Sequence, residues 1–118
     1  MRDPVPSFGL GRLPRITFGP GVFEQVPAIV ARHGTRALLV TGGRSFNASP
    51  RRAALEAALA EADVTLLGST TVSGEPSPAD VEEPVARYRD QGVEVVIGIG
   101  GGAALDTAKA IAVSSTHL

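Results

Sequence analysis

Three consecutive glycines, Gly100, Gly101 and Gly102, are the residues of this chain whose type and spacing best suit binding of a ligand. They follow an apolar stretch and precede an amphipathic helix that we predict over residues 103–113. The first backbone N–H groups of a helix have no acceptor within it, and they coincide with the positive end of the helix dipole. Glycine at that point allows close approach to the backbone, so the motif predicts a phosphate-binding loop. The alternative is a tight turn in which the glycines serve only packing and positive φ.

Two common phosphate motifs do not fit these glycines. A Walker A loop requires a lysine directly after its last glycine, but Lys109 lies about two helical turns further on. The dinucleotide fingerprint that follows a first strand requires an acidic residue about 20 positions downstream, beyond residue 118. Because the glycines follow the third regular strand, a ribose contact is expected from an earlier strand end, at Thr41, Gly42 and Gly43.

Apolar strands and helices alternate through most of the sequence. Ser49 with Pro50, and Ser77 with Pro78, each form an N-cap followed by a proline at the first helical position. Pro84 lies inside the second of these helices and is expected to bend or interrupt it. Continuous apolar strands separated by helices predict an α/β fold with a parallel sheet buried on both faces. The predicted strands are residues 37–41, 64–67 and 94–97, and the predicted helices are residues 51–62, 78–91 and 103–113.

Ligands of such folds bind beyond the carboxyl ends of the strands. In this chain that edge of the sheet is predicted to carry residues 41–45, the loop 73–78 and the three glycines.

The first third of the sequence is less regular. Residues 1–12, with two prolines and two glycines, predict an extended amino-terminal arm, which leaves residues 13–118 as the α/β domain. Residues 15–18 predict a short strand outside the regular repeat, free to pair across a subunit boundary in a homo-oligomer. Apolar residues at helical spacing over residues 22–30 predict a helix, and Gly34 is expected to end it in the left-handed conformation.

Composition excludes several classes of function. The 118 residues include 11 Lys and Arg against 12 Asp and Glu, so the chain lacks the surplus of basic residues that would indicate a nucleic-acid partner. No cysteine is present, which excludes disulfides, thiolate metal sites and cysteine nucleophiles. The amino terminus has no apolar leader, and no stretch reaches about 18 apolar residues, so we expect a cytoplasmic protein without a membrane partner.

Four segments together resemble the amino-terminal domain of the iron-containing (group III) alcohol dehydrogenases, in the same order and over nearly the whole chain. They are RITFGPG at residues 15–21, LVT at 39–41, EPS at 75–77 and GGGAALDTAK at 100–109. The last segment is the most specific, because it combines the glycines with Asp106 and Lys109 at fixed spacing.

The resemblance implies a three-layer, Rossmann-like domain with helical crossovers, similar to the amino-terminal domain of dehydroquinate synthase, that binds NAD or NADP. In the family a carboxy-terminal helical domain follows, where one aspartate and three histidines hold a divalent metal, iron or zinc. The implied reaction is hydride transfer between the nicotinamide and a small metal-bound alcohol, aldehyde or ketone. His33 and His117 are the only histidines here, so metal and catalytic residues are expected in a domain that this chain lacks. The chain alone is therefore expected to be inactive.

Carried onto matching positions, the resemblance implies a cofactor site formed by two loops and one helix. The predicted cofactor-binding residues are Thr41, Gly42, Gly43, Arg44, Gly100, Gly101, Gly102, Ala103 and Asp106.

Some of these positions depart from the family pattern. Ala103 stands where serine is common, so it keeps the N–H group and loses a hydroxyl that can reach the pyrophosphate. Gly42 stands where many members carry an aspartate that accepts from the adenine ribose. Without that carboxylate a 2′-phosphate meets no repulsion and Arg44 can pair with it, which predicts a preference for NADP over NAD. The alternative is that Arg44 is a solvated loop charge. Glu75, where asparagine is frequent, can only accept, which favours a loop role over contact with a phosphate.

Three charged positions have structural explanations of their own. Asp106 is predicted in the first turn of the last helix, where a carboxylate favours the dipole or, as the resemblance implies, orients the cofactor. Lys109 is expected to pair with Asp106, and His33 is expected to be a cation at a helix end.

Two other functions compatible with this sequence stay open. One is a relative such as a glycerol dehydrogenase or a dehydroquinate-synthase-like lyase, which share a similar amino-terminal layout. The other is a free-standing nucleotide-binding module, flavodoxin-like in outline, with no chemistry of its own.

Overall fold

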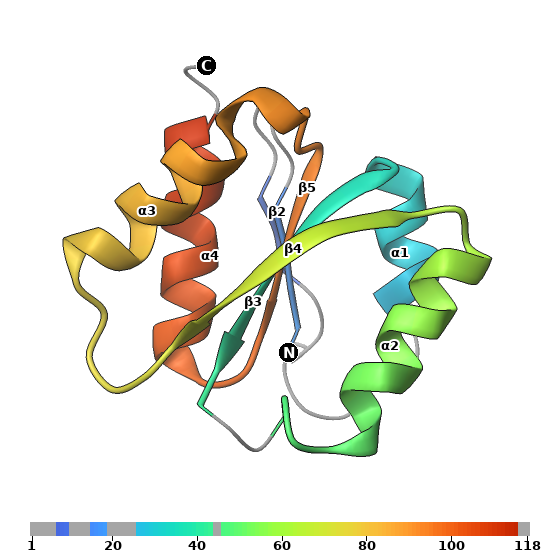
Figure 1. The fold of residues 1–118 in the computed structure, drawn as a ribbon, viewed down its shortest axis with the longest axis horizontal. Coiled ribbons are helices and arrows are strands. Elements are labelled where there is room, and N and C mark those ends of the chain that lie inside the picture. Colours follow the sequence, from blue (N-terminus) through green and yellow to red (C-terminus); the bar gives the residue numbers. More distant parts are fainter. Residues whose placement is uncertain (1–6, 10–14, 19–25, 44–45, 116–118) are drawn as a thin grey trace.

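A five-stranded sheet organises the chain in the computed structural model, which describes residues 7–9, 15–18, 26–43 and 46–115. Its strand order is β1-β2-β5-β3-β4 (Figure 1). β2, β5, β3 and β4 run parallel to their neighbours, and β1 pairs antiparallel with β2. The strands are β1 (Ser7–Gly9), β2 (Arg15–Phe18), β3 (Arg36–Gly42), β4 (Thr65–Val72) and β5 (Val95–Ile99).

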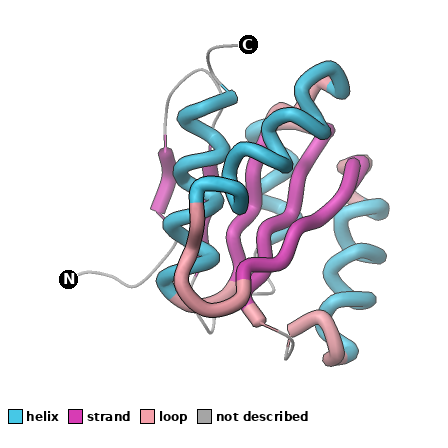
Figure 2. The backbone as a smooth tube through the Cα atoms, turned by 60° about the vertical axis from the view of Figure 1, so that its left-hand side comes forward, coloured by secondary structure: helices cyan, strands magenta, loops and turns pink. Residues whose placement is uncertain are grey.

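Helices cover both faces of the sheet and make three layers. α1 (Val26–His33) and α2 (Pro50–Glu61) lie on one face, while α3 (Pro78–Tyr88) and α4 (Gly102–Ser115) lie on the other (Figures 1 and 2). The predicted α/β, Rossmann-like architecture is confirmed. Among these four helices, none is long and apolar enough to cross a membrane.

Strand β3 shows how the alternation of side chains builds two separate cores. Ala37 and Leu39 face α1 and α2, whereas Leu38 and Val40 face α3 and α4, and all four are buried. Successive strand residues point to opposite faces, so an uninterrupted apolar run is what a doubly covered strand requires. The first core comprises Val26, Val30, Ala37, Leu39, Leu55, Leu59, Val64, Val95 and Ile97; the second comprises Leu38, Val40, Val72, Val96, Ala108, Ile111 and Ala112.

The two Ser-Pro pairs begin helices as predicted. The Ser49 side chain accepts from the Arg51 N–H at 3.2 Å, and Asp80 accepts from the Ser77 N–H at 2.7 Å. Pro84 does not interrupt α3, which is continuous to Tyr88. A 3₁₀ turn, η2 (Arg89–Gln91), follows and ends at Gly92 with φ 73°.

Strand β4 is longer than the apolar stretch that predicted it. It extends through Gly68 and three hydroxyl residues to Val72, because it pairs with β3 along its length. β4 is the last strand in the order of the described sheet, and most of its residues are half-buried. Polar side chains can be accommodated there because they are not fully removed from solvent. Gly68 gives room to α3, since a Cβ there would collide with the Tyr88 hydroxyl.

Gly34 follows α1, but the prediction of a left-handed stop is wrong, because its φ is not positive. The reason for glycine is space instead. A Cβ on Gly34 would lie 2.6 Å from the Cβ of Glu94, at the turn before β5.

The amino-terminal segment also differs from expectation where it is described. Ser7–Gly9, within the predicted arm, form β1. β2 pairs with β5 of the same chain, with Ile16 opposite Ile97, so the interpretation of this strand as a subunit contact is wrong. The remaining residues of the arm lie outside the described ranges.

Candidate functional site

The carboxyl ends of β3, β4 and β5 meet at one edge of the sheet, which is the lower end in Figure 1. The register places Thr41 beside Ile99 of β5 and Gly42 beside Val72 of β4. The loop after each strand therefore starts from the same edge, as predicted. Figure 2 shows these loops in pink where they leave the strands.

The three glycines have different roles in the structure. Gly100 has φ 141°, and a Cβ on it would lie 2.9 Å from the Gly42 nitrogen, so packing and conformation both require glycine there. Gly101 and Gly102 are exposed, and a Cβ on either would meet nothing within 4 Å. Packing therefore explains the first glycine, while the other two leave an open approach to the backbone.

Helix α4 begins at this open approach. Leu105 N–H donates to the Gly101 carbonyl at 3.1 Å, which closes the first turn. The N–H groups of Gly101, Gly102 and Ala103 precede that bond, and helix geometry provides them with no acceptor in the helix. They suit an anion, because the dipole adds partial positive charge at the same place.

Gly42 lies directly beside the glycine loop. A Cβ on it would be 3.2 Å from the Cβ of Ala104, which is fully buried, and 3.7 Å from the Gly101 nitrogen. Gly43 has φ 69°, and its N–H donates to the Val72 carbonyl at 3.1 Å. The structure thus brings Gly42 and Gly43 together with the glycine loop. Arg44 lies outside the described residues.

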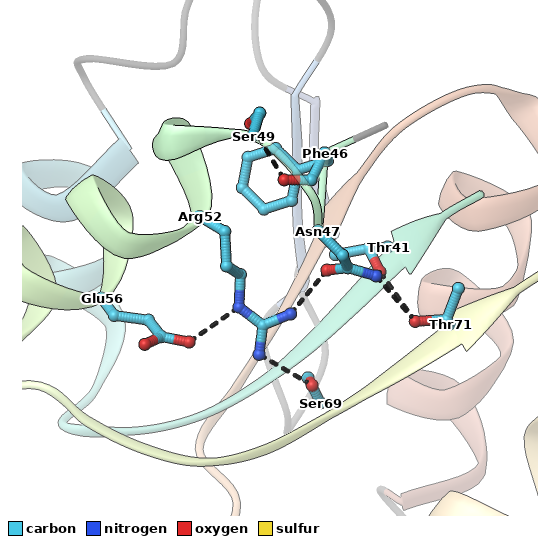
Figure 3. Close-up of polar contacts among 8 residues, drawn as sticks. All are labelled: Thr41, Phe46, Asn47, Ser49, Arg52, Glu56, Ser69 and Thr71. Carbon is cyan, nitrogen blue, oxygen red and sulfur yellow. Dashed lines mark hydrogen bonds and ion pairs between the residues drawn. The ribbon is translucent and has the colours of Figure 1, made fainter. Parts of the chain in front are cut away.

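Thr41 is also at this edge, but its side chain points to the opposite face from Gly42. It is fully buried, and its hydroxyl lies 3.1 Å from Asn47 Nδ2 and 3.2 Å from the Thr71 hydroxyl (Figure 3). The alternation of side chains along β3 produces this separation. Thr41 therefore contributes its hydroxyl to an internal network.

That network was not predicted from the sequence. Arg52 donates from Nη1 to Asn47 Oδ1 at 2.6 Å and from Nη2 to Ser69 Oγ at 3.0 Å, and its Nε forms an ion pair with Glu56 at 2.7 Å (Figure 3). The i,i+4 spacing of Arg52 and Glu56 was readable in the sequence. The contacts with β4 were not, because they depend on how α2 crosses the sheet.

Ala103 lies in the first turn of α4, as predicted, whereas Asp106 does not. Ala103 is half-buried against the second core. Because α4 starts at Gly102, Asp106 is in the second turn, and the prediction of a first-turn carboxylate is wrong. Asp106 and Lys109 are both exposed and form no ion pair, contrary to expectation. Exposed pairs gain little in water, so three-residue spacing alone does not hold two side chains together.

His33 lies in the last turn of α1, so its predicted place at a helix end is confirmed. Glu75 is exposed in the loop between β4 and α3.

One hollow of the described surface lies away from the glycine loop. A groove of about 650 Å³ runs between α2 and β4, lined by residues that include Arg52, Glu56, Asp63 and Ser69. None of its lining residues is a predicted cofactor residue.

Among the carboxylates of the described residues, the one with a shifted pKa lies at the other edge of the sheet. The Thr35 N–H donates to Glu94 Oε1 at 2.7 Å, and this bond is the main reason that the pKa of Glu94 lies below its ordinary value. The Thr35 hydroxyl and the Arg36 charge add to the effect. Glu94 joins the turns before β3 and β5, so this shift belongs to the scaffold.

Comparisons with known proteins agree with this architecture. A family model described as iron-containing alcohol dehydrogenase matches residues 14–117. The probable NADH-dependent butanol dehydrogenase 1 of Bacillus subtilis is 29% identical over 103 residues, which are 87% of this chain and 27% of that protein. NADH-dependent butanol dehydrogenase B of Clostridium acetobutylicum is 32% identical over 103 residues, covering 87% of this chain and 26% of that protein.

Among solved structures, an archaeal halo-thermophilic alcohol dehydrogenase from a Red Sea brine pool is 27% identical with a TM-score of 0.76. The alignment covers 94% of this chain and 27% of that one. The chain thus spans about a quarter of the length of the curated relatives that it matches.

Proposed function

Because this chain belongs to the iron-containing alcohol dehydrogenase family, we propose that it is the dinucleotide-binding part of an NAD(P)-dependent alcohol dehydrogenase. The complete enzyme interconverts a small alcohol and the corresponding aldehyde or ketone. The relatives with which it aligns are named as butanol dehydrogenases that depend on NADH, which supports a nicotinamide cofactor. Residues 13–118 are the proposed cofactor-binding domain.

The observation that carries this proposal is the open backbone of Gly101 and Gly102 at the start of α4, beside Gly42. The N–H groups of Gly101, Gly102 and Ala103 would bind the pyrophosphate. Gly42 and Gly43 would lie against the adenosine ribose, with Arg44 next to them in sequence. Asp106 would lie one turn further along α4, on the exposed side. When bound, the nicotinamide supplies the hydride acceptor or donor; these residues hold the rest of the cofactor.

The family also implies a divalent metal, iron or zinc. Among the residues that the structure describes, no group of three His, Cys, Asp or Glu side chains could hold one. No step of the reaction is therefore assigned to a metal on this part of the protein. We propose that metal and substrate are bound by residues outside this chain and that the chain by itself has no dehydrogenase activity.

The proposal is tested by titrating the 118-residue chain with NADH, NADPH and FMN and following the fluorescence of each nucleotide. We expect a dissociation constant of about 1 mM or lower for a nicotinamide dinucleotide, because the backbone N–H groups at the start of α4 would bind its pyrophosphate. Selective binding of FMN would replace the dehydrogenase assignment with that of a flavodoxin-like module.

The same titration tests the finer prediction that NADP is preferred to NAD. The absence of a side chain at Gly42 supports it, because a carboxylate there would repel a 2′-phosphate. The NADH dependence in the relatives' names does not support it. A lower dissociation constant for NADPH than for NADH is the expected result; the reverse order would assign this chain to NADH.

A further inference from the structure

The side-chain amide of Asn47 has only one orientation that satisfies its neighbours (Figure 3). An arginine can only donate, so the oxygen of the amide must face Arg52 Nη1, 2.6 Å away. The amide nitrogen then faces the hydroxyls of Thr41 and Thr71, at 3.1 and 3.0 Å. Because the two hydroxyls are also 3.2 Å apart, Asn47 closes a triangle between the ends of β3 and β4.

Arg52 is itself held by two elements. Its ion pair with Glu56 fixes it along α2, and its bond to Ser69 fixes it to β4. The Arg52 side chain is only 23% exposed, so this ion pair is less screened than one in open solvent. Each of the three guanidinium nitrogens makes one bond, so the arginine holds the Asn47 amide in a fixed position.

This network anchors the loop between β3 and α2, which begins at Gly43, directly after Gly42 at the end of β3. At its start the Gly43 N–H is bonded to the Val72 carbonyl at 3.1 Å. At its end Phe46 packs on the first core, and its carbonyl accepts from the Ser49 hydroxyl at 2.9 Å. Asn47 adds side-chain bonds from this loop to Thr41 at the end of β3 and to Thr71 at the end of β4. Without the Asn47 side chain, the loop keeps the bonds of Gly43 and Phe46 at its two ends but loses the bonds from Asn47 to Thr41 and Thr71.

We propose that Asn47, oriented by Arg52, is a positioning residue for dinucleotide binding. It fixes the loop after β3 so that Gly42 and Gly43 present their backbone to the adenosine ribose beside the glycine loop. This inference rests on the proposed function, because it requires that the loop contact the cofactor.

The test compares dissociation constants for NADH and NADPH in the 118-residue chain and its variants. Asn47→Ala is expected to weaken the tighter nucleotide about tenfold, because more than one net hydrogen bond is lost. Thr71→Val removes one corner of the triangle and is expected to cost about fivefold, while Thr71→Ser keeps the hydroxyl and binds like the unmodified chain. Thr71 is exposed and valine favours strands, so Thr71→Val retains the thermal unfolding midpoint. If the hydrogen bonds of Asn47 served only the stability of the fold, Thr71→Val would lower nucleotide affinity only together with the thermal unfolding midpoint.

Arg52→Met and Arg87→Met form the matched pair of controls. Each breaks an i,i+4 ion pair with a glutamate, Glu56 on α2 or Glu83 on α3. We expect only Arg52→Met to weaken the nucleotide, by about tenfold, because only Arg52 supports Asn47. Circular dichroism confirms that each variant is folded before titration.

The outcomes separate the two proposals. If the unmodified chain binds neither nucleotide, the proposed function fails and this inference fails with it. If the unmodified chain binds but folded Asn47→Ala binds within twofold of it, only the positioning role is overturned. Equal losses in Thr71→Ser and Thr71→Val would also overturn it, because the hydroxyl would then be irrelevant.

Discussion

At the carboxyl edge of the sheet, neighbouring glycines are present for different reasons. Gly100 is required by its backbone conformation and by the approach of Gly42, whereas Gly101 and Gly102 could carry a Cβ without touching the protein. Only the second kind of glycine is evidence for a ligand, because only there does the fold not explain the missing side chain.

Gly42 gives a prediction at this scale. Gly42→Asp places a carboxylate beside Gly101, so it should disfavour a 2′-phosphate and shift the ratio of the NADPH and NADH dissociation constants about tenfold towards NADH. Gly42→Asn is the matched control, since it has the same size without the charge and should change the ratio less than about twofold. Equal shifts in the two variants would show that size, and not charge, sets cofactor choice. Titration of both nucleotides measures it.

Thr107 carries a buried hydroxyl that makes no hydrogen bond with the described residues. It is 2% exposed on α4, and within the described ranges its hydroxyl has no hydrogen-bond partner. Thr107→Val removes this buried hydroxyl at nearly constant shape, so we expect a gain of about 1 kcal/mol in the free energy of unfolding. The thermal midpoint should rise by about 4 °C. Thr107→Ser, which keeps the hydroxyl and loses a methyl, should be less stable than the unmodified chain. A midpoint lowered by Thr107→Val would mean that the hydroxyl has a partner after all.

At the scale of elements, β3 is the strand that separates scaffold from site. Its alternation directs Thr41 into the network under α2 and turns Gly42 towards α4, where a Cβ would lie 3.2 Å from the Cβ of Ala104. Its amino end is tied to the turn before β5 through Thr35 and Glu94. The same strand thus has a polar anchor at each end and an apolar centre.

The Glu94 anchor predicts a pH dependence of stability. Its pKa is lowered in the folded chain, chiefly by the Thr35 N–H, so its charged form stabilises folding. That contribution is complete above the unfolded pKa and is lost as the pH falls through the lower, folded pKa. Because Glu94 is exposed, we expect it to amount to no more than about 1 kcal/mol. Urea unfolding of the unmodified chain and Glu94→Gln should show a stability difference at pH 7 that shrinks as the pH falls below about 4.5. A difference that stays constant with pH would contradict this assignment.

At the scale of the whole molecule, the strand order makes the site. β3 lies between β4 and β5, so two loops that are far apart in sequence leave the sheet side by side. The three layers bury both faces of the sheet, and its carboxyl edge remains the place where backbone is accessible. The chain is about a quarter of its relatives' length, and metal binding, substrate binding and activity are proposed only for the complete protein. A homo-oligomer and a cytoplasmic location stay predictions.

The sequence by itself determined the fold class, the two Ser-Pro helix starts, the apolar strands and the family. Local propensity and periodicity carry that information, because caps, turns and apolar runs act within a few residues. Pro84 shows the limit of such rules, since α3 continues through it. The extension of β4, the pairing of β2 with β5 and the reason for glycine at position 34 depend on a neighbour distant in sequence.

For the candidate site, the glycines and their helix were readable as a motif. What only the tertiary structure decided is which glycines are open, where the Thr41 side chain points, and that Asn47 and Arg52 join β3, β4 and α2. Those facts follow from strand order and from the path of α2 across the sheet. A single sequence does not contain them locally, because each depends on atoms brought together only when the layers pack.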